Sequence, residues 1–143
     1  MTNFNDLLVS VHDAETLAPI LGDRRRTDRF DADAADALAD VLMDARMVSH
    51  DRLPADRIAI NSRVTYREEP RGEPRTVMLV HPSDANATEG RISVLSPVGR
   101  ALLGRKPGAV SSTGVAGGRA VTIRVLAAER SAWVPSRSME EAR

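Results

Sequence analysis

Four arginines cluster in a short polar stretch of this sequence, GDRRRTDRF at 22–30. They are Arg24, Arg25, Arg26 and Arg29. Guanidinium groups suit oxyanions such as phosphate, because their planar fork of N–H donors matches the geometry of these ligands. A solvated loop tip has the same composition, and this second interpretation is favoured. A phosphate site is therefore kept here only as the alternative.

Three aspartates recur at every fourth position, at Asp36, Asp40 and Asp44. This spacing places them on one face of a helix, where carboxylates could bind a divalent cation. Like charges at this spacing destabilise a helix mildly unless something neutralises them. A solvated helix face is nevertheless the favoured interpretation of the three carboxylates.

The remaining reactive residue types are sparse. The chain has no cysteine, and its three histidines, His12, His50 and His81, lack the spacing of metal ligands. We find no nucleophile motif and no loop that would cradle a phosphate. The sequence therefore predicts a protein that is not an enzyme and that holds no metal ion and no cofactor.

The stretch GRISVLSPVGRALLGRKPG, at 90–108, predicts a strand, a helix and a turn in close succession. Residues 91–95 alternate, with Ile92 and Val94 on one face of a half-buried strand. Ser96 is placed to accept a hydrogen bond from a free amide of the first helical turn. Pro97 suits the first helical position, because its missing N–H costs nothing there.

The helix that follows has an apolar stripe and a clear end. Val98, Ala101 and Leu102 stand three and four residues apart, and Gly104 is the left-handed residue expected just after a helix. Basic side chains suit the carbonyl end of a helix, and three of them lie here, at Arg100, Arg105 and Lys106.

The first third of the chain predicts two helices. Residues 1–12 are a weakly apolar strand or extended arm. Asp13 opens a first helix over 13–21, which Pro19 should keep short or distorted because proline disfavours a helix interior. Asp31 or Asp33 caps a second helix that reaches about residue 47, and the two should form a short antiparallel hairpin.

The rest of the chain is dominated by strand patterns. Strands are expected over 57–66, with a bend or bulge at Asn61 and Ser62, and over 76–80, 109–113 and 120–127. Turns are expected at 67–74, 81–90 and 114–118. Residues 131–143 read as a polar tail in which Trp133 alone is worth burying. The fold class is thus α+β, a helical hairpin over 1–50 followed by a mostly antiparallel sheet with one helix over 51–130.

A formal net charge of zero hides an asymmetry. The first 60 residues carry 12 acidic and 7 basic side chains, a net charge of −5, and the remainder carries 8 acidic and 13 basic, a net charge of +5. Two segments that face different partners would explain this division, and so would composition drift. No apolar run approaches the roughly 20 residues of a membrane span, and residues 1–10 lack the pattern of a signal peptide. A cytoplasmic protein without a membrane partner is expected.

The run RISVLSPVGRALLGRKPG resembles the signature of the C-terminal domain of Gre-type transcription elongation factors, typically I-S-V-x-S-P-x-G-x-A-L-L-G-x-x-x-G. The upstream run LADVLMDARMVSHDRLPADRIAINSRVTYRE is similar to a smaller branch of the same family, which has a short helical hairpin in place of the long Gre coiled coil. Together the resemblance covers residues 8–128, and it implies an FKBP-like fold for the C-terminal part.

The resemblance implies binding to bacterial RNA polymerase at the rim of its secondary channel, in competition with Gre factors and without direct sequence-specific binding to nucleic acid. The docking residues would be Leu95, Ser96, Pro97, Gly99 and Arg100. In Gre factors, acidic residues at the coiled-coil tip hold a catalytic Mg²⁺ and stimulate transcript cleavage. The hairpin here is too short and its tip is rich in arginine, so no cleavage stimulation is expected.

Two positions depart from the Gre pattern. Leu95 stands where an acidic residue usually precedes the Ser-Pro pair, and Ala109 stands where an aspartate often follows the turn glycine. Charge complementarity orients partners and speeds association, so both changes bear on how strongly the chain docks.

Two other functions remain as alternatives. The first is a protein-interaction module that regulates nucleoside diphosphate kinase or another enzyme, as the name of the smaller branch suggests. The second, less favoured, is a peptidyl-prolyl isomerase, suggested by the FKBP-like fold alone. Such an enzyme needs an aromatic-lined pocket, and after residue 60 the chain offers only Tyr66 and Trp133.

Overall fold

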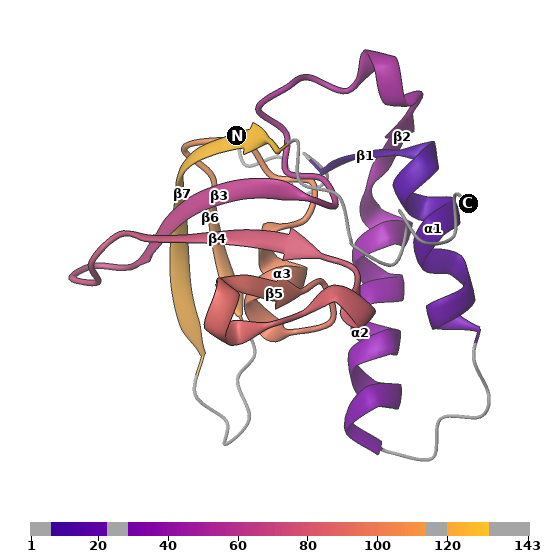
Figure 1. Cartoon of the computed structure of the whole chain (residues 1–143), viewed down its shortest axis with the longest axis horizontal. Coiled ribbons are helices and arrows are strands. Elements are labelled where there is room, and N and C mark those ends of the chain that lie inside the picture. Colours follow the sequence, from indigo (N-terminus) through magenta and orange to yellow (C-terminus); the bar gives the residue numbers. More distant parts are fainter. Residues whose placement is uncertain (1–6, 23–28, 114–119, 132–143) are drawn as a thin grey trace.

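The computed structural model of the chain describes residues 7–22, 29–113 and 120–131, without the side chains of 29–31. Two helices and a small two-stranded sheet stand beside a curled five-stranded sheet that wraps around a third helix (Figure 1). The α+β class expected from the sequence is therefore confirmed. The predicted arginine loop at 24–26, the turn at 114–118 and the tail with Trp133 lie outside the described residues.

Helix α1 (Val11–Leu21) begins earlier than the sequence predicts. Its N-cap is Ser10, not Asp13, because the Ser10 hydroxyl oxygen accepts a hydrogen bond from the Asp13 N–H at 3.0 Å. Pro19 lies inside α1 without ending it, and the buried side chains of Leu17 and Ile20 on either side pack into the core.

Helix α2 (Arg29–Asp44) both begins and ends before the predicted bounds. It stops early because the next residues form strand β2 (Arg46–Val48), which pairs in parallel with strand β1 (Leu8–Ser10). The pairing ties the start of the described chain to the end of α2, and α1 and α2 run in opposite directions (Figure 1). A short 3-10 helix, η1 (His50–Arg52), follows β2.

The larger sheet has the strand order β5-β4-β3-β7-β6. Its strands are β3 (Ser62–Glu68), β4 (Arg75–Val80), β5 (Arg91–Ser93), β6 (Val110–Thr113) and β7 (Val121–Arg130). All neighbours are antiparallel except β4 and β5, which are parallel because the chain crosses back through the short helices η2 (Pro82–Asp84) and η3 (Ala87–Glu89). Helix α3 (Pro97–Leu102) connects β5 to β6.

The predicted strand over 57–66 is wrong in its first half, whereas the bend predicted at Asn61 and Ser62 is confirmed. Asn61 has a φ of 73°, and the Ser62 N–H bonds to the Ala59 carbonyl, so the chain turns before β3 begins. Ile58 instead pairs with the segment after α3, donating to the Arg105 carbonyl at 2.9 Å and accepting from the Gly104 N–H at 2.9 Å. Ile58 is still fully buried, so the apolar pattern predicted burial correctly.

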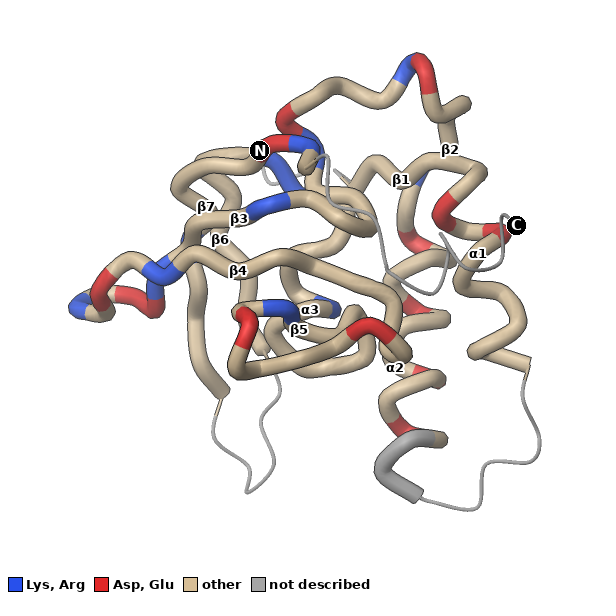
Figure 2. Tube along the Cα trace, viewed as in Figure 1, with Lys and Arg blue, Asp and Glu red and all other residues tan. Residues whose placement is uncertain are grey.

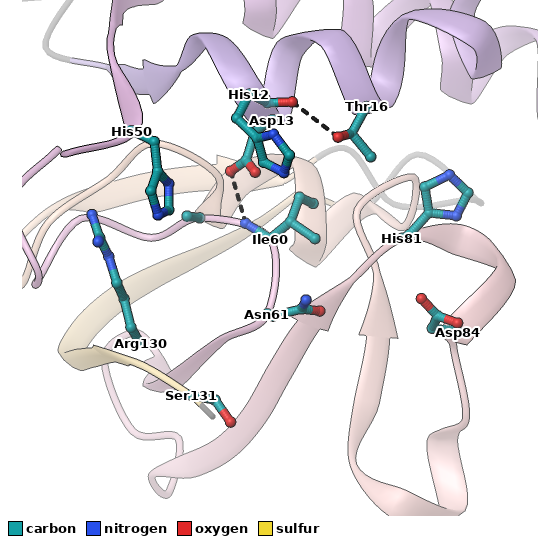
Figure 3. A pocket seen from close by; sticks show the side chains of 11 residues that line it. His12, Asp13, Thr16, His50, Ile60, Asn61, His81, Asp84, Arg130 and Ser131 are labelled. Carbon is teal, nitrogen blue, oxygen red and sulfur yellow. Dashed lines mark hydrogen bonds between the residues drawn. The ribbon is translucent and has the colours of Figure 1, made fainter. Parts of the chain in front are cut away.

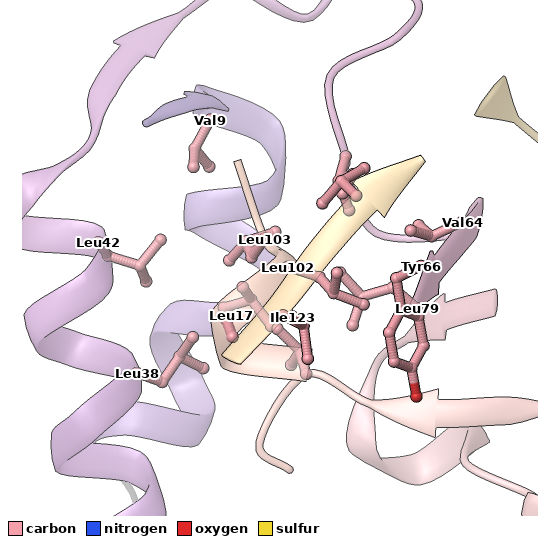
Figure 4. Packing of buried hydrophobic residues seen from close by; sticks show 14 of the residues in the cluster. Val9, Leu17, Leu38, Leu42, Val64, Tyr66, Leu79, Leu102, Leu103 and Ile123 are labelled. Carbon is pink, nitrogen blue, oxygen red and sulfur yellow. The ribbon is translucent and has the colours of Figure 1, made fainter. Parts of the chain in front are cut away.

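One continuous apolar core joins the helices to the sheet (Figure 4). Leu17 of α1 and Leu38 of α2 are fully buried in the same cluster as Leu102 and Leu103, at the end of α3, and Ile123 of β7. Burial of each such side chain contributes roughly 1.5–3 kcal/mol to folding. The two helices are thus held on the sheet by its own core.

Gly104 joins the end of α3 to strand β1 and to the segment around Ile58 through hydrogen bonds. Its φ of +81° confirms the left-handed stop after α3, and its carbonyl accepts from the Leu8 N–H at 3.1 Å and from the Arg57 guanidinium at 3.0 Å. A Cβ atom here would lie 3.2 Å from a methyl carbon of Val9. Glycine is therefore favoured both by the backbone conformation and by the close approach of β1.

Acidic side chains recur along α2. Figure 2 shows acidic residues repeated along α2, whereas the sheet carries both signs. Asp36, Asp40 and Asp44 are all exposed on α2, and the described ranges contain no group of three His, Asp or Glu side chains that could hold a metal ion. None of the helices in these ranges is long and apolar enough to cross a membrane.

Candidate docking surface

The turn between β5 and α3 is fixed by the Ser96 hydroxyl. Its oxygen accepts from the Gly99 N–H at 3.0 Å, as predicted for a helix cap, and the hydroxyl also donates to the Ser93 carbonyl at 2.7 Å. The Ser93 hydroxyl in turn accepts from the Leu95 N–H at 2.9 Å. These bonds leave Ser96 and Pro97 half-buried at the surface.

Gly99 and Arg100 stabilise this turn. Gly99 is buried, and a Cβ atom there would lie only 2.1 Å from the Ser93 carbonyl oxygen. The Arg100 guanidinium bonds to the Leu95 carbonyl, and burial lowers the pKa of Arg100. The structure therefore uses both residues to hold the loop that precedes α3.

Leu95 and Ala109 both pack against the core as partly buried residues. These are the two positions where the Gre pattern has acidic residues. Ala109 also exchanges backbone bonds with its neighbours, since its carbonyl accepts from the Val125 N–H at 2.9 Å. An apolar side chain suits each position, because a carboxylate there would lose part of its hydration.

A mostly apolar cavity of about 570 Å³ opens beside the turn. Ser96 and Pro97 form one wall with Val98, and Tyr66 of β3 and Ile92 of β5 line it too. Leu95, Gly99 and Arg100 do not line it, so the structure brings only two of the five predicted docking residues to its edge.

The cavity has an unsatisfied polar group in its wall. Thr113, at the end of β6, is 3% exposed, and its hydroxyl has no hydrogen-bond partner. Leaving such a group unpaired costs about 1–3 kcal/mol. The site therefore combines apolar surface with one buried group that can pair with an incoming donor or acceptor. Thr113 was missed in the sequence because an isolated threonine in a strand carries no functional signal.

The three histidines are far apart in the sequence but lie around one cavity. His12, His50 and His81 line a second cavity, between α1 and the start of β3, and the rings of His12 and His50 are 6.0 Å apart. Their separation along the chain concealed this arrangement. The arginines at 24–26 lie outside the described residues, and so does the side chain of Arg29.

Comparison with known proteins identifies the region that carries the turn. The family model "Transcription elongation factor, GreA/GreB, C-term" matches residues 53–130. The "Regulator of nucleoside diphosphate kinase" of Escherichia coli K12 is 39% identical over 95 residues, covering 66% of this chain and 70% of that protein. The transcription elongation factor GreA of Desulfovibrio desulfuricans is 35% identical over 81 residues, covering 57% of this chain and 49% of GreA.

A solved structure extends the likeness to both parts of the fold. A prokaryotic transcription elongation factor GreA/GreB from Nitrosomonas europaea aligns with a TM-score of 0.66 at 29% identity, covering 86% of this chain and 97% of that one. The resemblance seen in the sequence is therefore confirmed. The chain belongs to the GreA/GreB family of transcription elongation factors.

Proposed function

We propose that this protein is a noncatalytic regulator that binds bacterial RNA polymerase at the rim of the secondary channel and does not stimulate transcript cleavage. The observation that carries the proposal is the match of residues 53–130 to the GreA/GreB C-terminal family. That segment contains the Ser96–Pro97 turn and all of the described residues that line the apolar cavity. The resemblance implies an FKBP-like fold for this segment, and the position of α3 against a curled sheet supports that part of the proposal.

The docking surface in this proposal is the Ser96–Pro97 turn together with the apolar cavity. An apolar cavity with the unpartnered hydroxyl of Thr113 in its wall suits an apolar side chain of the polymerase accompanied by a hydrogen-bonding group. Leu95 and Arg100 act indirectly, by fixing the turn through the Leu95 carbonyl. Gly99 also acts indirectly, because the absence of a side chain there leaves room for the Ser93 carbonyl oxygen.

The helices support a role without catalysis. Helix α1 has 11 residues and α2 has 16, so α2 is about 24 Å long. Ala35, Leu38 and Leu42 of α2 are buried, and only the six residues 29–34 precede the first of them. Little of the helical pair is therefore left to extend into a channel.

A cleavage assay tests the catalytic half of the proposal. Stalled elongation complexes are incubated with this protein, with a Gre factor, or with both. The Gre factor alone should shorten the transcript, this protein alone should leave it unchanged, and an excess of this protein should slow the Gre-dependent reaction. Transcript shortening by this protein alone would overturn the noncatalytic assignment.

The name of the Escherichia coli relative favours a second candidate, an interaction module that regulates nucleoside diphosphate kinase. A pull-down in which purified kinase and core polymerase compete for the immobilised protein separates the two. The isomerase alternative gains little, because Tyr66 is the sole aromatic among the described residues that line the apolar cavity.

A further inference from the structure

A second cavity, of about 540 Å³, lies where the helices meet the sheet. Side chains from five separate segments line it (Figure 3). They include His12 and Asp13 of α1, His50 of η1, Asn61 of the turn before β3, His81 and Asp84 of the segment after β4, and Arg130 at the end of β7. The cavity is distinct from the proposed docking surface, and the two share none of their lining residues.

Asp13 is the buried charge of this cavity. It is 6% exposed, and one carboxylate oxygen, Oδ2, accepts from the Ile60 N–H at 3.0 Å. Burial raises the pKa of Asp13, against the opposing effects of the Ile60 bond and of His12, His50 and Arg130. A buried carboxylate beside an open cavity is stabilised by any further cationic donor that reaches it.

The lining is rich in hydrogen-bond acceptors. Asp13 and Asp84 carry carboxylates on different walls, and the side-chain oxygen of Asn61 is buried without a partner. Arg130 is the permanent cation of the lining, and it donates to the Leu53 carbonyl at 2.6 Å. Figure 3 shows its guanidinium end beside His50, and the charge of Arg130 also acts on Asp13.

A bare metal ion does not suit this lining. No group of three His, Asp or Glu among the described residues is close enough together to hold one. The acceptors are instead spread around a space large enough for an organic molecule. A ligand that carries several N–H donors along a chain would reach both carboxylates at once.

We propose that this cavity binds a small linear polyamine, with one ammonium group at Asp13 and another at Asp84. The methylene groups between them would lie against the imidazole rings and Ile60. The inference rests on the lining and size of the cavity and is independent of polymerase binding.

Spermidine is the probe, and the three imidazoles are the reporters, because the chain has three histidines and all of them line this cavity. Imidazole NMR signals of the full chain are followed during titration at constant pH and ionic strength. Saturable shifts of the His12 and His50 signals are expected, with a dissociation constant of about 1 mM or below. Absence of saturation at tenfold higher concentration would overturn the proposal.

Variants assign the binding to named groups. Asp13→Asn keeps an oxygen that can accept from the Ile60 N–H but removes the charge, and it should weaken spermidine binding at least tenfold. Asp84→Asn should weaken it too, and it decides the matter if the first variant fails to fold. Asp40→Asn, on the exposed face of α2, is the matched control and should bind as the wild type does.

Two further ligands test the two-ended geometry. n-Butylamine carries a single ammonium group and should bind at least tenfold more weakly than spermidine. Mg²⁺ at equal ionic strength should produce no saturable shift. Equal binding of n-butylamine, or of Mg²⁺, would overturn the assignment of two carboxylates to one polyamine.

Discussion

Ser96 and Gly99 are joined by a hydrogen bond of 3.0 Å, from the Gly99 N–H to the Ser96 hydroxyl oxygen. The same hydroxyl donates to the Ser93 carbonyl oxygen, which would lie only 2.1 Å from a Cβ atom on residue 99. The Ser-Pro-x-Gly pattern is therefore a packing unit as well as a helix start. It sets the position of Pro97 at the edge of the apolar cavity.

Gly99→Ala should destabilise the fold. The new methyl group would meet the Ser93 carbonyl oxygen at 2.1 Å, so the turn must move and lose its hydrogen bonds. A loss of at least about 2 kcal/mol in the free energy of unfolding is expected, measured by urea denaturation. Gly22→Ala is the control, because its nearest contact is 3.8 Å away and its φ is −95°. Equal stability of the two variants would contradict the packing argument.

Pro97→Glu should weaken polymerase binding at least tenfold without disturbing the fold. An acidic residue is favourable at the start of a helix, because it faces the positive end of the helix dipole. Pro54→Glu, at an exposed loop position, is the matched control and should bind normally. Affinity of core polymerase for each folded variant, measured by surface plasmon resonance, checks this. Unchanged affinity of the Pro97 variant would remove the turn from the docking surface.

Asp13 should make folding less favourable as pH rises. Burial raises its pKa above the ordinary value of 3.8, so the folded state binds the proton more tightly than the unfolded state. The resulting stabilisation is complete below pH 3.8 and is lost as pH rises through the folded-state pKa. The stability of Asp13→Asn relative to the wild type should therefore increase across this interval and then level off.

Urea denaturation of both proteins at a series of pH values provides that comparison. Subtracting the two curves removes the contribution of Glu69, whose pKa is lowered chiefly by its hydrogen bond to Arg124. A difference that stays flat, or falls with rising pH, would show that the burial of Asp13 does not govern its protonation.

The sequence predicted best where local chemistry decides the structure. Ser96, Pro97 and Gly104 occupy the cap, the first turn and the left-handed stop of α3 as expected, because each role follows from the residue's own geometry. Predictions were wrong where a distant segment decides. Strand β2 ends α2 early by pairing with β1, and Ile58 pairs with Gly104 instead of extending β3.

The residues of the two cavities also divide into those placed by local structure and those placed by distant segments. Ser96 and Pro97 line the apolar cavity because of local structure, whereas Thr113 and Tyr66 line it because of the fold of the sheet. His12, His50 and His81 come together only because the helices pack on the sheet. The spacing of the three histidines in the sequence does not show that they lie close together in the fold, so the second cavity could not be predicted.

Competition for core RNA polymerase tests the central claim most directly. Labelled protein at micromolar concentration is bound to purified core enzyme, and an unlabelled Gre factor is then titrated in. We predict binding, and complete displacement by the Gre factor, because both proteins would occupy the rim of the secondary channel. Failure to bind, or binding that the Gre factor does not displace, would contradict the account.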